Sequence, residues 1–248
     1  MEIKLLEWDT AFFKRPVVKV SIDAVEQVEM EQVLENCKSK GYKFLYFFVD
    51  AINTAMVAEL THRLGEPINE KLIFVITDLD PGKINAHLDA ALTVVNAGQL
   101  KTDPLFREQL LQLTIKAGAF SRFKIDAALD DSYFKELYTT WTTAMLNDSD
   151  YRIIVAKHKD EKTAGITGFL SYKIINEGYR IEFMSINEAY QKKGIGKALL
   201  KKMMEEVYGN GPGYVTTEIH RANDSAYHFF LSNRFSLTEA VNIYHVHL

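Results

Sequence analysis

The chain has 248 residues, with 47% hydrophobic and 25% charged side chains, which is the composition of a globular protein with one large or two modest domains. A formal net charge of −4 disfavours a protein that wraps nucleic acid, and no apolar run is long enough to cross a bilayer. The single cysteine, Cys37, excludes an intrachain disulfide framework and is expected to be a buried thiol in a reducing compartment. Because the first ten residues lack the apolar core of a signal peptide, we expect a cytoplasmic protein with no membrane and no nucleic-acid partner.

The first hundred residues alternate strand-like and helix-like patterns, which predicts a small α/β domain over residues 1–100. Runs of β-branched and aromatic residues favour strands, and apolar spacings of three and four favour helices. The predicted strands are residues 17–22, 44–49 and 72–77, and the predicted helices are residues 25–40 and 53–63. A polar segment that ends at Asp103-Pro104 marks the boundary to a second domain over residues 101–248.

The second half shows a helix, a meander of strands, and then alternating helices and strands. The predicted helices are residues 105–116, 131–147, 197–208 and 223–232. The predicted strands are residues 120–125, 151–157, 163–175, 179–186 and 214–220, and residues 235–248 are predicted to form a closing hairpin. An apolar C-terminal strand of this kind is also a candidate for pairing across a two-fold axis in a homodimer.

Residues 181–200 combine a strand, a glycine-spaced loop and a helix. The loop reads Gln191-Lys192-Lys193-Gly194-Ile195-Gly196-Lys197. Backbone N–H groups at the start of a helix bind anions, and a glycine lets the main chain approach a phosphate because it has no Cβ. The two adjacent lysines add positive charge. The sequence therefore predicts a phosphate-binding loop, although it contains neither a triphosphatase P-loop nor a G-x-G-x-x-G motif.

The element order, the Gln-x-x-Gly-x-Gly loop and the later Asn223-x-x-Ala226 resemble the GNAT N-acetyltransferase superfamily over about residues 118–248. The resemblance implies an α/β fold with a mixed, mostly antiparallel sheet flanked by helices. It also implies that acetyl-CoA is the cosubstrate, with no metal. The residues that it assigns to acetyl-CoA are Ser185, Ile186, Gln191, Lys192, Lys193, Gly194, Ile195, Gly196, Lys197, Asn223 and Phe230.

Two further segments extend the resemblance to one branch, the TDP-fucosamine acetyltransferases. They are LEWDTAFF at residues 6–13 and AGAFSRFKID at residues 117–126. The branch acetylates the amine of a TDP-linked amino-deoxy sugar, so the resemblance implies a nucleotide-linked amino sugar as the acceptor. Residues 1–100 are then expected to shape the acceptor site. The alternatives are another amine, such as a polyamine, an amino acid or a protein N-terminus, and a non-catalytic module that binds acyl-CoA.

The chain departs from the family pattern where a tyrosine commonly reprotonates the thiolate of CoA. Phe230 stands at that position, and phenylalanine cannot donate a proton. Tyr227 lies one helical turn earlier and is our candidate for the acid, with the adjacent His228 as an alternative.

A general base for the amine is the second catalytic requirement. Glu182 is the first candidate because it stands in an otherwise apolar strand that leads to the loop, where burial would raise its pKa. Glu218 and His220 on the next predicted strand are alternatives.

His245 and His247 alternate along the last predicted strand, which puts both imidazoles on one face. A metal pair is conceivable there, but no third ligand stands nearby in the sequence. We therefore expect a polar strand face and no metal.

Overall fold

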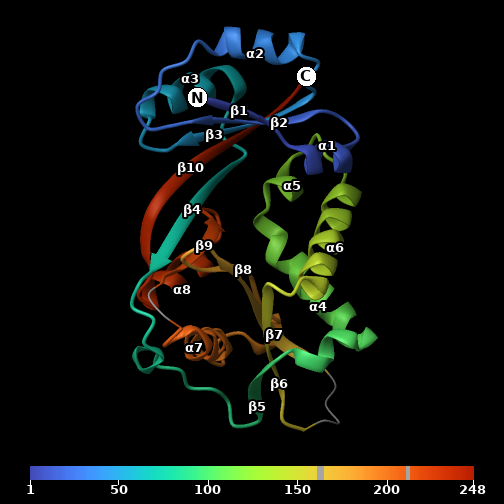
Figure 1. Ribbon diagram of the computed structural model, residues 1–248, viewed down its shortest axis with the longest axis vertical. Helices are drawn as coiled ribbons and strands as arrows, with labels where there is room; N and C mark the ends of the chain where they lie inside the picture. The colour runs from blue at the N-terminus through green and yellow to red at the C-terminus, as the bar shows by residue number, and fades with distance from the viewer. Residues whose placement is uncertain (161–164, 211–212) are drawn as a thin grey trace.

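The computed structural model describes residues 1–160, 165–210 and 213–248, and a single large sheet dominates it (Figure 1). The strands are β1 (Glu2–Leu5), β2 (Val17–Ile22), β3 (Phe44–Asp50), β4 (Asn69–Ile76), β5 (Leu92–Asn96), β6 (Tyr151–His158), β7 (Ile166–Ile175), β8 (Gly178–Ile186), β9 (Val215–His220) and β10 (Ser236–His247). Within the described residues they lie in the order β1-β2-β3-β10-β4-β9-β8-β7-β6-β5, and only the β2–β3 and β8–β9 pairs are parallel. The prediction of a mixed, mostly antiparallel sheet flanked by helices is confirmed.

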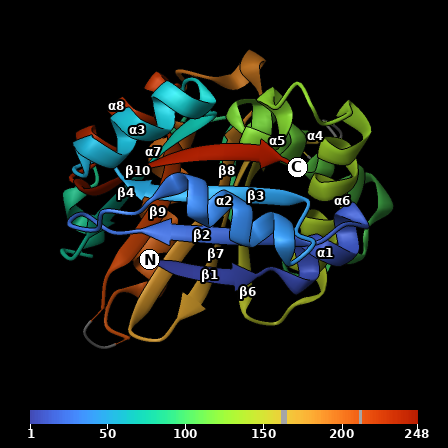
Figure 2. The ribbon, with the colours of Figure 1, turned by 90° about the horizontal axis from the view of Figure 1, so that it is seen from above.

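Helices cover both faces of this sheet (Figures 1 and 2). The α-helices are α1 (Glu7–Phe13), α2 (Met30–Ser39), α3 (Thr54–Leu64), α4 (Pro104–Ala117), α5 (Arg122–Ile125), α6 (Asp131–Asn147), α7 (Ile195–Val207) and α8 (Asp224–Ser232). Short 3₁₀ segments are η1 (Pro81–Lys83), η2 (Gly98–Thr102), η3 (Gly118–Phe120) and η4 (Glu188–Tyr190). On one face, α2 and α3 pack on the N-terminal strands and α7 and α8 on the C-terminal ones; α1, α4, α5 and α6 pack on the other face.

Strand β10 joins the two halves of the sheet. Residues 241–247 pair with β3, and residues 236–243 pair with β4. The predicted hairpin over 235–248 is wrong, because the segment is one strand whose partners lie far away in the sequence. Both edges of β10 are paired within the chain only over residues 241–243, and pairing of this strand across a two-fold axis stays a prediction.

Two strands from the first hundred residues lie among strands of the C-terminal half. β4 is inserted between β9 and β10, and β5, which the sequence patterns did not predict, forms an edge beside β6. Of the predicted strand over 163–175, residues 163–164 lie outside the described residues and β7 begins at Ile166.

The predicted strand over residues 120–125 is also wrong. The chain instead forms η3 and then the short helix α5, which Ser121 caps by accepting a hydrogen bond from the backbone N–H of Phe123 at 3.3 Å. Of the two aromatic residues in this segment, Phe123 is buried against the N-terminal strands from α5, whereas Phe120 lies in η3 and is exposed.

Cys37 is buried and free in α2, as the sequence predicts. Among the helices of the described residues, none has both the length and the apolar character needed to cross a membrane.

Candidate active site

A cavity opens where β8 and β9 part. These two strands pair over only three residues of each, Tyr179–Ile181 against Val215–Thr217. Beyond that point, residues 182–186 of β8 keep β7 on one edge and have no described strand on the other. The resulting cavity of about 570 Å³ is lined by the free edge of β8, by residues 217–220 of β9 and by the start of α8.

The predicted phosphate-binding loop lies at the start of α7, next to the end of β8. Gly194 is the N-cap of this helix and has a left-handed φ of 79°. In the described part of the chain, the backbone N–H groups of residues 194–197 donate to no acceptor. A helix start with free N–H groups and lysines beside it is an anion site, so these residues fit the pyrophosphate of a CoA molecule.

The two glycines of the loop differ in their surroundings. A Cβ on Gly194 would overlap the backbone carbonyl oxygen of His87, so this position needs glycine for space as well as for its φ. A Cβ on Gly196 would lie 2.9 Å from the ring of Phe229, and Gly196 is buried where α7 packs on α8. Gly196 therefore serves helix packing, and the contact of Gly194 with a phosphate stays a prediction.

The other residues assigned to acetyl-CoA divide into two groups. The cavity lining includes Ser185, Ile186, Gln191, Asn223 and Phe230. Gln191 Nε2 donates to the carbonyl oxygen of Ile186 at 3.4 Å, and Asn223 Oδ1 caps α8 by accepting from the N–H of Ala226 at 3.1 Å. The remaining residues of the loop, 192–197, are not part of the lining formed by the described residues.

A second cavity, of about 430 Å³, lies between the sheet and the segment that carries α5 and α6. Phe48 and Lys71, from the first hundred residues, are in its lining. It shares seven lining residues with the first cavity, so the two cavities meet there. These are Tyr138, Ile181, Glu182, Phe183, Glu218, Ile219 and His220.

Both carboxylates at this junction have a cationic partner. A β-bulge makes Glu182 the extra residue between Ile181 and Phe183, and its Oε1 accepts from Arg180 Nη2 at 2.7 Å. Glu218 pairs with Lys71 at 3.1 Å. Glu182, the predicted base, therefore lies at the junction but is held by an arginine.

His220 and Tyr138 are the uncharged titratable groups of the junction. The Nδ1 atom of His220 is buried and has no hydrogen-bond partner among the described residues, and burial lowers the pKa of its imidazole to about 4, with Arg122 adding to the effect. Burial raises the pKa of the Tyr138 phenol. At neutral pH the junction thus offers a neutral imidazole and a protonated phenol.

Tyr138 was missed by sequence reasoning, which placed it in the predicted helix over residues 131–147 without singling it out. Its ring and hydroxyl lie over Gly118, where a Cβ would overlap them. Gly118 is therefore the sequence signal of this arrangement, but it can be recognised only once η3 and α6 are known to be in contact.

Tyr227 packs away from both cavities. Its ring contacts Phe74 with a centroid distance of 5.7 Å and lies under the guanidinium of Arg221 at 4.9 Å. Within the described residues, Tyr227 is not in the lining of either cavity, whereas Phe230 lines the first one. The acid role of Tyr227 stays a prediction.

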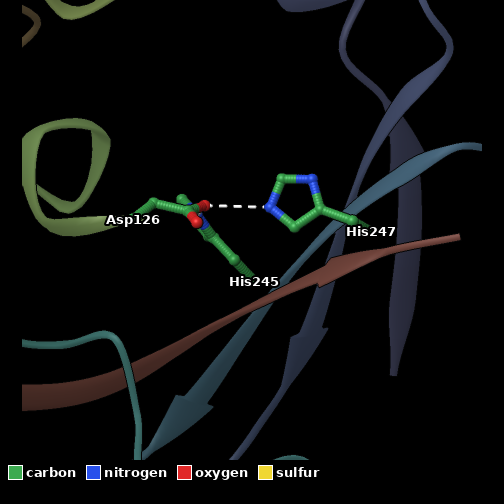
Figure 3. A group of neighbouring side chains, drawn as sticks. All are labelled: Asp126, His245 and His247. Atoms are coloured by element: carbon green, nitrogen blue, oxygen red, sulfur yellow. Dashed lines mark hydrogen bonds and ion pairs between the residues drawn. The ribbon is translucent and has the colours of Figure 1, made fainter. Parts of the chain in front are cut away.

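A separate cluster joins His245 and His247 of β10 to Asp126, which follows α5 (Figure 3). Asp126 Oδ2 accepts from His245 Nδ1 at 2.6 Å and from His247 Nε2 at 3.0 Å. The guanidinium of Arg15 donates to the other nitrogen of His247 at 3.2 Å. Ligands of a tetrahedral metal lie about 3.3 Å apart, as bonds of 2.0–2.1 Å require, so these shorter distances are those of hydrogen bonds.

Asp126 is therefore the third polar group of the cluster, and the sequence pattern did not reveal it. The cluster links the end of α5 to the end of β10. Burial opposes ionisation of Asp126, but the hydrogen bonds from both histidines outweigh it and hold the pKa of the carboxyl below its usual value. Burial lowers the pKa of His245 to about 4.

Comparisons with known proteins agree with this geometry. Residues 120–234 match the model of the acetyltransferase (GNAT) family. Comparison with curated proteins gives no match.

Three solved structures are similar to most of the chain. One is a GCN5-related N-acetyltransferase from Sphaerobacter thermophilus, at 12% identity, covering 99% of this chain and 76% of that chain with a TM-score of 0.66. Another is a functionally unknown conserved protein from Staphylococcus epidermidis, at 14% identity, 94% and 84% coverage and a TM-score of 0.61. The third is a tandem GNAT protein from the clavulanic acid biosynthesis pathway, at 14% identity, 94% and 75% coverage and a TM-score of 0.57. At these identities the likeness concerns the fold alone.

We predict that Gly194→Ala lowers the free energy of unfolding by roughly 1–3 kcal/mol, because the new Cβ meets the His87 carbonyl and the φ is left-handed. Gly41→Ala is the matched control: its φ is 76°, and nothing lies within 4 Å of its Cβ position. Urea denaturation of both variants separates the two causes. Equal losses would show that the His87 contact costs nothing.

We predict that His245→Asn flattens the pH dependence of stability between pH 6.5 and 4. The unfolded histidine binds a proton below about pH 6.5 but the folded one only below about pH 4, so the wild type loses stability as the pH falls through this window, by about 3 kcal/mol for this residue. The asparagine amide keeps a donor for Asp126 and does not titrate. Urea unfolding at several pH values measures the slope, and an unchanged slope contradicts the assignment. His62→Asn, at an exposed site on α3, is the control.

Proposed function

The chain carries a GNAT-family N-acetyltransferase domain, and we propose that it transfers an acetyl group from acetyl-CoA to the amine of a nucleotide-linked amino sugar. The observation that carries the proposal is the meeting of two cavities at one set of residues. One cavity follows the free edge of β8 to α8 and ends beside the loop that precedes α7, and the other opens toward the first hundred residues. A thioester in the first and an amine in the second meet at this junction.

The phosphates of acetyl-CoA are bound by the N–H groups of residues 194–197, with Lys192, Lys193 and Lys197 supplying charge. Its pantetheine arm lies along β8. Because β9 has parted from β8, alternate N–H groups of residues 182–186 have no ladder partner within the described part of the chain and are free to donate to the arm. An N–H group near Ile186 stabilises the negative charge that develops on the thioester oxygen.

His220 is our proposed acceptor of the amine proton. It is neutral at physiological pH, its Nδ1 has no partner among the described residues, and it lines both cavities. The free amine then attacks the thioester carbonyl, and the C–S bond of the tetrahedral intermediate breaks to release the CoA thiolate. The nitrogen loses its second proton as the amide forms, which balances the proton that the thiolate takes up. Glu182 is the alternative base, although its pairing with Arg180 weakens its case.

Tyr138 is our proposed donor of a proton to the departing thiolate. Its phenol stays protonated because burial raises its pKa, and it lies at the junction, where Phe230 has no proton to give. Tyr227, the residue suggested by the sequence, would need to turn away from Phe74 to donate a proton to the thiolate.

Residues 1–100 are proposed to form the domain that shapes the acceptor site, with residues 101–248 as the catalytic domain. Phe48 and Lys71 support this division of labour, because both line the second cavity. The segment that resembles the TDP-fucosamine branch, residues 6–13, contributes Phe12 and Phe13 to the core beside α5.

The acceptor is tested by measuring release of the CoA thiol with a panel of amines. We expect turnover with a TDP-linked 4-amino-4,6-dideoxy sugar at a kcat/KM at least about tenfold above that for a polyamine, an amino acid or a peptide N-terminus, since each mispaired polar group costs a factor of this size. A higher value for one of the other amines would assign the chain to that acceptor. Binding of acetyl-CoA without turnover on any amine would favour a non-catalytic module.

We predict that His220→Asn lowers kcat by about 10²- to 10⁴-fold, the usual contribution of general-base catalysis, while the affinity for acetyl-CoA is retained. His62→Asn, at an exposed site on α3, is the matched control and should leave kcat unchanged. Glu182→Gln is measured alongside. A large loss in this variant together with full activity of His220→Asn would make Glu182 the base.

A further inference from the structure

Arg122 is a cation that no carboxylate of the described residues neutralises at close range. Its Cζ lies 4.5 Å from the ring centroids of Tyr46 and of Phe123 and 5.1 Å from that of Phe48. Over residues 1–160, 165–210 and 213–248, its guanidinium has neither a hydrogen-bond acceptor nor an ion pair. Yet it lines the second cavity and is only partly exposed.

Two lysines lie around the same ring as Arg122. Lys19 Nζ is 4.4 Å and Lys71 Nζ is 5.6 Å from the centroid of Phe48. Glu218 pairs with Lys71, and neither Lys19 nor Arg122 has an ion pair among the described residues. Burial, and after it repulsion from Lys71 and Arg122, lowers the pKa of Lys19, which is the sign of a local excess of positive charge.

Three aromatic rings lie close to the guanidinium, and its N–H groups have no acceptor among the described residues. The N–H edge of a guanidinium matches two oxygens of a phosphate or carboxylate at once. A partly desolvated cation without a partner is unfavourable, so the cluster gains most from an anion that arrives with a ligand. The nearest acidic groups, Asp9 and Glu218, act on Arg122 only at longer range.

We propose that Arg122, supported by Lys71 and Lys19, forms a subsite that binds an oxyanion of the acceptor and so orients its amine toward His220. The orientation of the amine toward His220 rests on the proposed function, whereas the binding of an oxyanion by Arg122 does not. The oxyanion is the diphosphate of a sugar nucleotide or the carboxylate of an amino acid, and the two are told apart by binding.

The test titrates TDP, thymidine and glutamate into the full chain saturated with CoA, so that the predicted phosphate loop is already filled. For TDP we expect Arg122→Met to weaken binding about 10- to 100-fold, the range of a charge-assisted, bidentate contact, and Lys71→Met to weaken it less. Uncharged thymidine should be unaffected by either change. Arg63→Met, at an exposed arginine on α3, is the matched control.

Circular dichroism and CoA affinity show whether each variant is folded, and Arg122→Lys, which keeps the charge, replaces Arg122→Met if that variant does not fold. Equal TDP affinity in the wild type and the folded Arg122 variant overturns the subsite, as does a wild type that binds neither TDP nor glutamate. Arg122-dependent binding of glutamate in place of TDP supports the subsite but contradicts the sugar-nucleotide acceptor. If CoA itself does not bind, the proposed function fails, and titration of TDP into the free chain still tests Arg122.

Discussion

The parting of β8 and β9 after three paired residues is the constraint on which the rest of the site depends. Each strand is held on its outer edge, β8 by β7 and β9 by β4, so the gap between them stays open without the loss of either strand. In the proposed function, the gap frees a strand edge for the pantetheine arm of acetyl-CoA and leads to the helix start that would bind its pyrophosphate. The β-bulge in which Glu182 is the extra residue lies where β8 and β9 part.

The acceptor side of the site depends on β4. Because this strand from the first hundred residues pairs with β9, Lys71 stands opposite His220 and beside Glu218. β10 then connects β4 to β3, which carries Phe48 and Tyr46 under Arg122. One continuous sheet thus brings these cationic and aromatic side chains to the same junction as the free edge of β8.

The sequence predicts the parts of the site that local chemistry determines. The strand–loop–helix around Gly194 and the helix that starts at Asn223 follow from neighbouring residues, and both are found. What could not be predicted depends on contacts between distant segments. Residues 120–125 look like a strand but form a helix, β10 takes partners from β3 and β4, and Arg122, Tyr138 and Lys71 meet only in the folded chain. Likewise, the pattern of His245 and His247 gives no hint of Asp126.

Amide hydrogen exchange with and without acetyl-CoA tests the central claim most directly, namely that the gap between β8 and β9 and the start of α7 form one binding site. Acetyl-CoA should slow exchange in residues 182–186 and 194–197 together, because alternate N–H groups of the first segment and those of the second gain acceptors when the cosubstrate is bound. Exchange in α3, on the far part of the sheet, should not change. Protection that spares both segments, while acetyl-CoA is bound, would contradict the account.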